Sequence, residues 1–133
     1  MALVKSILLV DDDADDQEIF KTALLEVSES VHFFTASDGS DALLKLRTDT
    51  ALPELILLDM NMPIMNGLET LRQLKGDEKL KQIPVIVYST TVTPGFREET
   101  QALGATKFII KPSNFSDLCR FIISLVEPGE QKG

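Results

Sequence analysis

The stretch ILLVDDDADD, residues 7–16, sets four aliphatic residues directly before five aspartates in six positions. An uninterrupted aliphatic run is typical of a strand that is buried on both faces. Carboxylates this close together repel one another, and each raises the pKa of its neighbours unless a positive charge lies between them. The stretch therefore predicts a buried strand over residues 6–10, and acids after it that either point into water or share a cation.

The rest of the chain alternates between short apolar runs and segments with helical periodicity. The apolar runs predict four further strands, at residues 31–35, 54–58, 84–88 and 107–110. The periodic segments predict five helices, over residues 15–27, 40–47, 68–74, 94–103 and 115–126. The first of these has one apolar face that should be buried, made of Ile19, Phe20, Ala23, Leu24 and Val27. Strands that alternate with helices form a parallel sheet covered on both faces. We therefore predict an α/β fold, a doubly wound five-stranded parallel sheet with the flavodoxin-like order 2-1-3-4-5.

Length and charge limit the classes of protein to which the chain can belong. Its 133 residues suit one domain, which we place at residues 1–127, followed by a short polar tail at residues 128–133. The net charge of −8 disfavours nucleic acid and anionic membranes as partners and suits a basic protein or a divalent cation. A single cysteine, Cys119, excludes an internal disulfide, and no apolar run is long enough to span a membrane. We expect a cytoplasmic protein.

Polar side chains follow four of the predicted strands at the point where each strand ends. In a sheet of this order the ligand crevice lies at the carboxyl ends of the strands, between the first and the third. The residues that end the strands there are Asp11, Asp12 and Asp13, then Asp59, Ser89 and Lys111. Acids, a hydroxyl and a lysine are therefore expected to converge on one edge of the sheet.

These residue types indicate phosphoryl transfer rather than flavin binding. A flavin phosphate needs a loop rich in Ser, Thr and Gly after the first strand, whereas carboxylates repel phosphate. Oxygen ligands from two loops suit Mg²⁺, and Asp11, Asp12 and Asp59 supply the negative charge. A cation, the Lys111 ammonium and the Ser89 hydroxyl around a carboxylate make a site for a transferred phosphoryl group, with the carboxylate as nucleophile.

With these motifs in this order, the chain resembles the receiver domains of two-component response regulators over nearly its whole length. The resemblance rests on VDDD after the first strand, LLDMNMPIMNG around the third, PVIVYST at the fourth and GATKFIIKPS at the fifth. It implies that Asp59 accepts a phosphoryl group from a phosphohistidine of a sensor histidine kinase or a phosphotransfer protein. It also implies a stand-alone regulator that catalyses only its own phosphorylation and dephosphorylation.

The resemblance further implies a set of metal ligands. Asp12 and Asp59 would bind Mg²⁺ directly, the backbone carbonyl of Asn61 would be a third protein ligand, and Asp11 would act through water. Acid clusters at strand ends are also common as solvated loops. Asp13 stays open between a helix N-cap and a metal ligand.

The resemblance implies a conformational switch as well. Ser89 and Lys111 would bind the phosphoryl oxygens, and Ser89 would draw Phe108 inward on phosphorylation. That movement would repack the face of the fourth helix, fifth strand and fifth helix. The Lys111–Pro112 peptide bond would be cis. Because few residues follow the fifth helix, we expect the output to be a contact with a downstream protein partner.

Two other interpretations compete with phosphoacceptance at Asp59. Haloacid-dehalogenase-type phosphatases place an Asp-x-Asp nucleophile pair on the first strand, and Asp11 and Asp13 have that spacing, with Asp11 as the nucleophile. The chain is short for that fold, and DMNMP stays unexplained. A pseudo-receiver would bind partners without phosphorylation, but the complete set of acids, hydroxyl and lysine disfavours it. Asp15 and Asp16 are interpreted as first-turn charges favoured by the helix dipole.

The last predicted helix offers a candidate interface residue. At about 100° per residue, one stripe faces the sheet, made of Phe115, Leu118, Cys119, Ile122 and Val126. Phe121 lies well outside this stripe, so we expect its ring to be exposed. It is a candidate contact for a partner or for a phosphorylation-dependent homodimer. The alternative is that Phe121 packs against the fourth helix or a loop of its own chain.

Overall fold

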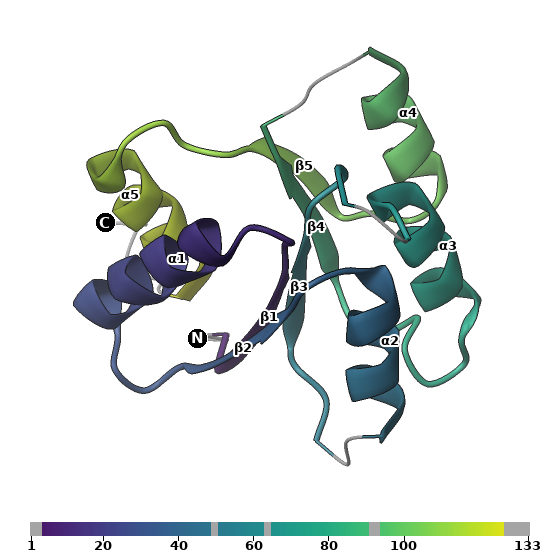
Figure 1. The fold of residues 1–133 in the computed structure, drawn as a ribbon, viewed down its shortest axis with the longest axis horizontal. Helices are drawn as coiled ribbons and strands as arrows, with labels where there is room; N and C mark the ends of the chain where they lie inside the picture. Colours follow the sequence, from purple (N-terminus) through teal and green to yellow (C-terminus); the bar gives the residue numbers. More distant parts are fainter. Residues whose placement is uncertain (1–3, 49–50, 63–64, 91–93, 127–133) are drawn as a thin grey trace.

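Figure 1 shows the fold in a computed structural model, which describes residues 4–48, 51–62, 65–90 and 94–126. The polar tail predicted at residues 128–133 lies outside these residues. Within the described ranges, no helix is long and apolar enough to cross a membrane.

Strands and helices alternate along the chain. The strands are β1 (Ser6–Val10), β2 (His32–Ala36), β3 (Leu55–Leu58), β4 (Val85–Ser89) and β5 (Lys107–Ile110). The helices are α1 (Ala14–Val27), α2 (Gly39–Thr48), α3 (Gly67–Gly76), α4 (Pro94–Ala102) and α5 (Phe115–Val126). All strand pairs are parallel in the order β2-β1-β3-β4-β5, which confirms the predicted fold class and strand order.

The helices form one layer on each face of the sheet. In Figure 1, α1 and α5 cover one face, and α2, α3 and α4 cover the other. Successive side chains of a strand point to opposite faces, so Leu8 and Val10 join the core under α2–α4, while Ile7 and Leu9 join the core under α1 and α5. Each layer therefore needs its own half of the β1 side chains, which is why residues 7–10 are all aliphatic.

The hydrogen-bond ladder of the sheet continues into the residues just beyond the strands. The backbone N–H of Asp11 donates to the carbonyl of the last β2 residue, and that of Asp59 to the carbonyl of the last β1 residue, both at 3.0 Å. The backbone N–H of Lys111 donates to the Ser89 carbonyl at 3.1 Å. The sheet itself therefore sets where the backbones of Asp11, Asp59, Ser89 and Lys111 lie relative to one another.

Three apolar side chains differ from the sequence prediction. Ile19, expected on the buried face of α1, is 49% exposed, and Phe115, expected in the core stripe of α5, is 45% exposed. Phe121, expected to be exposed, is half-buried and stacks on Tyr88 with ring centroids 5.5 Å apart. The premise for Phe121 as an exposed contact was wrong because its ring packs against the core under α1 and α5, where the buried ring of Tyr88 on β4 meets it. Cys119 packs against the same core, as predicted.

Gly67, the first residue of α3, brings this helix very close to the end of β3. Its N–H donates to the Met60 carbonyl at 3.1 Å. A Cβ at this position would lie 2.5 Å from the carbonyl oxygen of Asp59 and 2.4 Å from the Met60 methyl group. The close approach of the two backbone segments therefore requires a residue without a side chain.

We predict that Gly67→Ala lowers the free energy of unfolding by about 1–3 kcal/mol, because the new methyl group overpacks a site walled by backbone. Gly76→Ala is the matched control at the other end of α3, where a Cβ would meet no atom within 4 Å. That change should raise stability by about 0.4–1 kcal/mol through the unfolded chain. Urea unfolding of both variants measures the difference, and equal stabilities would contradict the packing at Gly67.

Candidate functional site

Three aspartates meet at the carboxyl edge of the sheet. Asp11, Asp12 and Asp59 each present one carboxylate oxygen, and these oxygens lie within 4.8 Å of one another. Asp11 and Asp59 are buried at the ends of β1 and β3, whereas Asp12 is exposed. The structure thus brings together the acids that the sequence placed at this edge.

Lys111 lies among these acids and joins them to the end of β5. Its Nζ atom is 2.7 Å from Asp11 Oδ2, 2.9 Å from Asp16 Oδ2 and 3.5 Å from Asp59 Oδ2. The lysine side chain is only 10% exposed, and that of Asp11 is not exposed at all. One ammonium therefore contacts three carboxylates, and the nearby Asp12 adds a fourth to the site, so acids outnumber the positive charge there.

The charge states of the buried pair follow from this environment. Burial raises the pKa of Asp11, and hydrogen bonds from Lys111 and from the Asp13 N–H only partly oppose that rise. Burial alone would lower the pKa of Lys111, but its hydrogen bonds to Asp11 and Asp16 outweigh burial and raise it. The lysine is thus a fixed positive charge, and Asp11 is a carboxylate that further positive charge would stabilise. Clustered carboxylate oxygens of this kind fit a divalent cation.

The loop after β1 orients Asp11 and starts α1. Asp13 caps the helix, since its Oδ1 accepts hydrogen bonds from the backbone N–H groups of Asp15 at 2.9 Å and Asp16 at 3.2 Å. The Asp13 N–H in turn donates to Asp11 Oδ1 at 2.9 Å. The structure therefore resolves the alternative left open for Asp13 in favour of the N-cap.

The other residues of the predicted site lie around Asp59 and β4. The Asn61 N–H donates to Asp59 Oδ1 at 3.2 Å, and Ser89 is fully buried at the end of β4. The ring of Phe108 is partly buried, with the Arg97 guanidinium of α4 lying 5.1 Å from its centroid. The Asn61 carbonyl as a metal ligand, and Ser89 and Phe108 as a switch, stay predictions.

One implied feature is wrong. The Lys111–Pro112 peptide bond is trans, as are all peptide bonds of the described residues. The trans isomer is the favoured form of an X–Pro bond by about 0.5–1 kcal/mol. In this conformation the Lys111 side chain already reaches Asp11.

Sequence reasoning missed Asp16. Both Asp15 and Asp16 were assigned to the helix dipole, yet Asp16 hydrogen-bonds to Lys111 and Asp15 remains exposed. The available signal was its position, three residues after the cap Asp13, in the first turn of the helix that starts at this edge. A first-turn side chain of such a helix can turn back toward the strand ends.

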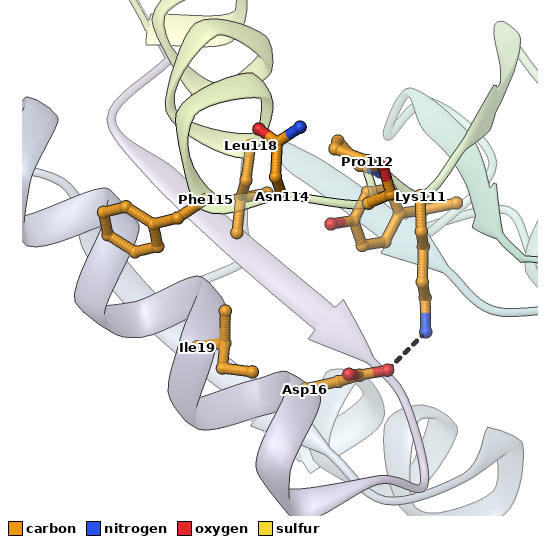
Figure 2. Close-up of a pocket in the computed structure, with 9 residues that line it drawn as sticks. Asp16, Ile19, Lys111, Pro112, Asn114, Phe115 and Leu118 are labelled. Atoms are coloured by element: carbon orange, nitrogen blue, oxygen red, sulfur yellow. Dashed lines mark hydrogen bonds and ion pairs between the residues drawn. The ribbon is translucent and has the colours of Figure 1, made fainter.

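A pocket of about 400 Å³ opens beside Lys111, between α1 and the beginning of α5. Figure 2 shows Asp16 and Lys111 at one side of it, with the apolar side chains of Ile19, Phe115 and Leu118 at the other. Ile19 and Phe115 are the two side chains that proved more exposed than predicted. Their exposure therefore belongs to a groove that leads to the charged site.

Residues 7–123 match the family model of the response regulator receiver domain, which covers most of the chain. The chain belongs to this family. It is 34% identical over 110 residues to the polar-differentiation response regulator DivK of Brucella ovis, covering 83% of this chain and 86% of DivK. It is 38% identical over 110 residues to a protein-glutamate methylesterase/protein-glutamine glutaminase of Halalkalibacterium halodurans, covering 80% of this chain. The receiver spans only 30% of that methylesterase's length.

Solved structures of response regulators have the same fold as this receiver. The phosphorylated cyanobacterial phytochrome response regulator RcpA superposes with a TM-score of 0.86 at 31% identity, covering 98% of this chain and 96% of RcpA. The Mn²⁺-bound form of response regulator Rcp1 superposes with a TM-score of 0.79 at 30% identity, covering 90% and 91%. The chain is therefore a receiver of two-component signalling, homologous to single-domain response regulators, with an acidic site suited to a divalent cation.

We predict that Asp12→Ala weakens binding of Mg²⁺ or Mn²⁺ by about tenfold or more, because it removes the one exposed carboxylate of the cluster. Asp15→Ala removes the same charge three residues further along the chain but leaves the cluster intact. This variant should bind either ion with nearly the affinity of the unmodified protein. Isothermal titration calorimetry with each ion measures the affinities. Equal affinities in the two variants would remove Asp12 from the cation site.

Proposed function

We propose that Asp59 accepts a phosphoryl group from a phosphohistidine on a sensor histidine kinase or a phosphotransfer protein. The observation that carries this proposal is the setting of its carboxylate. Asp59 lies at the edge of the sheet, 3.5 Å from the Lys111 ammonium and within 4.8 Å of the Asp11 and Asp12 oxygens. It is the acid of the cluster that directly follows the central strand β3.

The reaction forms one bond and breaks one. A carboxylate oxygen of Asp59 attacks phosphorus, the phosphorus–nitrogen bond of phosphohistidine breaks, and its electron pair returns to the imidazole ring. Such transfers need positioning and charge neutralisation more than covalent help from the protein. Lys111 neutralises phosphoryl oxygens, the Ser89 hydroxyl donates to them, and the Asn61 N–H holds the carboxylate.

Mg²⁺ is our choice of cation. Asp12 and Asp59 would hold it through carboxylates and Asn61 through its backbone carbonyl, with Asp11 acting through water. When bound, the ion supplies positive charge to the phosphoryl oxygens. Mg²⁺ is supported by the residues at the site, where three clustered carboxylates face the single positive charge of Lys111.

The haloacid-dehalogenase alternative has less support. It requires Asp11 and Asp13 to act on one substrate, whereas the Asp13 carboxylate caps α1. Asp11 is fully buried and already accepts hydrogen bonds from Lys111 and from the Asp13 N–H. These contacts suit a residue that holds the site together rather than a nucleophile.

The output would be a changed binding face. A phosphoryl group would draw the Ser89 hydroxyl toward it, and the Phe108 ring would follow into the space that Ser89 leaves. Phe108 would then lose its contact with Arg97, which would repack the surface of α4, β5 and α5. A downstream protein partner would bind this changed surface. The regulator itself would catalyse only its own phosphorylation and dephosphorylation.

The first test of this proposal is Asp59→Asn. We expect this variant to gain no phosphoryl group from acetyl phosphate or from a kinase while unfolding at nearly the same urea concentration. Asp11→Asn is the comparison, since any label it retains should still map to Asp59. Intact mass and peptide mapping provide the readout, and label on Asp11 in the Asp59→Asn variant would instead support the phosphatase alternative.

We also propose that the phosphodonor docks against the groove beside Lys111. Ile19 and Phe115 are exposed apolar side chains on the two helices that flank it, and a partner that presents a histidine to Asp59 must approach this end of the sheet. The apolar pair would pack against an apolar helical surface around that histidine.

We predict that Ile19→Ser slows phosphotransfer from a kinase that phosphorylates the unmodified chain by about five- to thirtyfold. Phosphorylation by acetyl phosphate, which needs no docking surface, should be unchanged. Leu25→Ser is the control, because Leu25 is 54% exposed on the same helix but does not line the groove. Equal effects of the two substitutions on kinase transfer would place the docking surface elsewhere.

A further inference from the structure

Asp16 lies on the first turn of α1, outside the sheet, yet its carboxylate reaches the Lys111 ammonium. The contact is a hydrogen bond of 2.9 Å, and the Asp16 side chain is 40% exposed while that of Lys111 is 10% exposed. Figure 2 shows it at the wall of the groove beside Lys111. Asp16 is thus the most exposed of the three acids that contact the lysine.

The distances rank the three acids that share Lys111. An ammonium has three N–H donors. Asp11 accepts one at 2.7 Å and Asp16 another at 2.9 Å, whereas Asp59 Oδ2 lies at 3.5 Å, beyond the usual range of an N–H···O hydrogen bond. Lys111 is therefore held least closely by the acid that lies at the centre of the proposed reaction.

We propose that Asp16 is a positioning residue that competes with the phosphoryl group for Lys111. This inference rests on the proposed role of Asp59. A phosphoryl group on Asp59 brings several oxygens that require charged donors. Because Asp11 and Asp16 each occupy one of the three N–H groups of Lys111, only one is left for these oxygens while Asp16 keeps its contact. Asp16 therefore weakens binding of the phosphoryl group and slows its attachment.

Asp11 holds Lys111 in place independently of Asp16, so the competition can be tested without releasing the lysine. It is fully buried, lies closer to Lys111 than Asp16 does, and is oriented by the Asp13 N–H. Loss of the Asp16 carboxylate leaves this anchor intact, and the Asp13 cap contacts only the backbone N–H of Asp16. Removal of the charge thus loosens the hold on one donor of Lys111 without releasing the lysine side chain from Asp11 or disturbing the start of the helix.

Asp15 provides the matched control for charge. It lies one residue away on the same turn and is exposed, and within the described parts of the chain the ion pairs of Lys111 are with Asp11, Asp16 and Asp59. Asp15→Asn and Asp16→Asn remove the same charge from the same helix end. Only Asp16→Asn replaces a charged acceptor of Lys111 by a neutral and weaker one.

The test is titration of beryllofluoride, a phosphoryl mimic, into the Mg²⁺-loaded protein, followed by amide NMR shifts. We expect Asp16→Asn to bind it about two- to fivefold more tightly than the unmodified protein, the range that one partly exposed ion pair supports. Asp15→Asn should bind as the unmodified protein does, and Asp16→Glu, which keeps the carboxylate, should restore the original affinity. Rates of phosphorylation by acetyl phosphate should follow the same order.

Three results would overturn the inference. Equal tightening in Asp15→Asn and Asp16→Asn would indicate general charge repulsion. Unchanged or weaker binding in Asp16→Asn would show that Asp16 does not compete for Lys111. Failure of Asp16→Glu to restore the original affinity would show that the carboxylate is not responsible. Failure of the unmodified protein to bind beryllofluoride or to be phosphorylated at Asp59 would instead overturn the proposed function, before any variant is compared.

Discussion

The rest of the site depends on the buried ion pair between Lys111 and Asp11. The two side chains are 10% and 0% exposed and their charged atoms are 2.7 Å apart, although the residues are 100 positions apart in the chain. Loss of Lys111 would leave the buried Asp11 carboxylate without an opposite charge, which typically costs about 3–5 kcal/mol. This pair therefore links the ends of β1 and β5 across β3, which Asp59 directly follows, and β4, which ends at Ser89.

The pair is placed by the sheet rather than by the loops. Backbone hydrogen bonds at 3.0 Å and 3.1 Å continue the ladder through Asp11, Asp59 and Lys111, so their Cα atoms are as well positioned as those of the strands. Helices on both faces bury the strands and keep water from the inner side of the edge. What remains open is one end of the sheet, where acids exceed positive charge. That excess is why the site suits a cation and then a phosphoryl group.

Charge and apolar surface meet at the groove between α1 and α5. Ile19 and Phe115 sit at its apolar side and Asp16 at its charged side, next to Lys111. A partner that docks on the apolar side chains would bring its histidine past the Asp16–Lys111 contact. The proposed docking, the proposed positioning of the lysine and the proposed phosphoacceptance at Asp59 would thus all lie at one end of the molecule, and each would involve different residues.

The sequence by itself determined the order of strands and helices and the set of acids, hydroxyl and lysine at one edge. This was possible because apolar periodicity is a local property and parallel strands of one sheet end on the same side. Only the tertiary structure decided the contact of Asp16 with Lys111, the cap at Asp13 and the trans bond before Pro112. It also decided the exposure of Phe115 and the burial of Phe121 against Tyr88. Helical periodicity specifies the direction in which a side chain points. Whether that side chain is buried depends on how far the side chains of the facing layer extend toward it, as the ring of Tyr88 does toward Phe121.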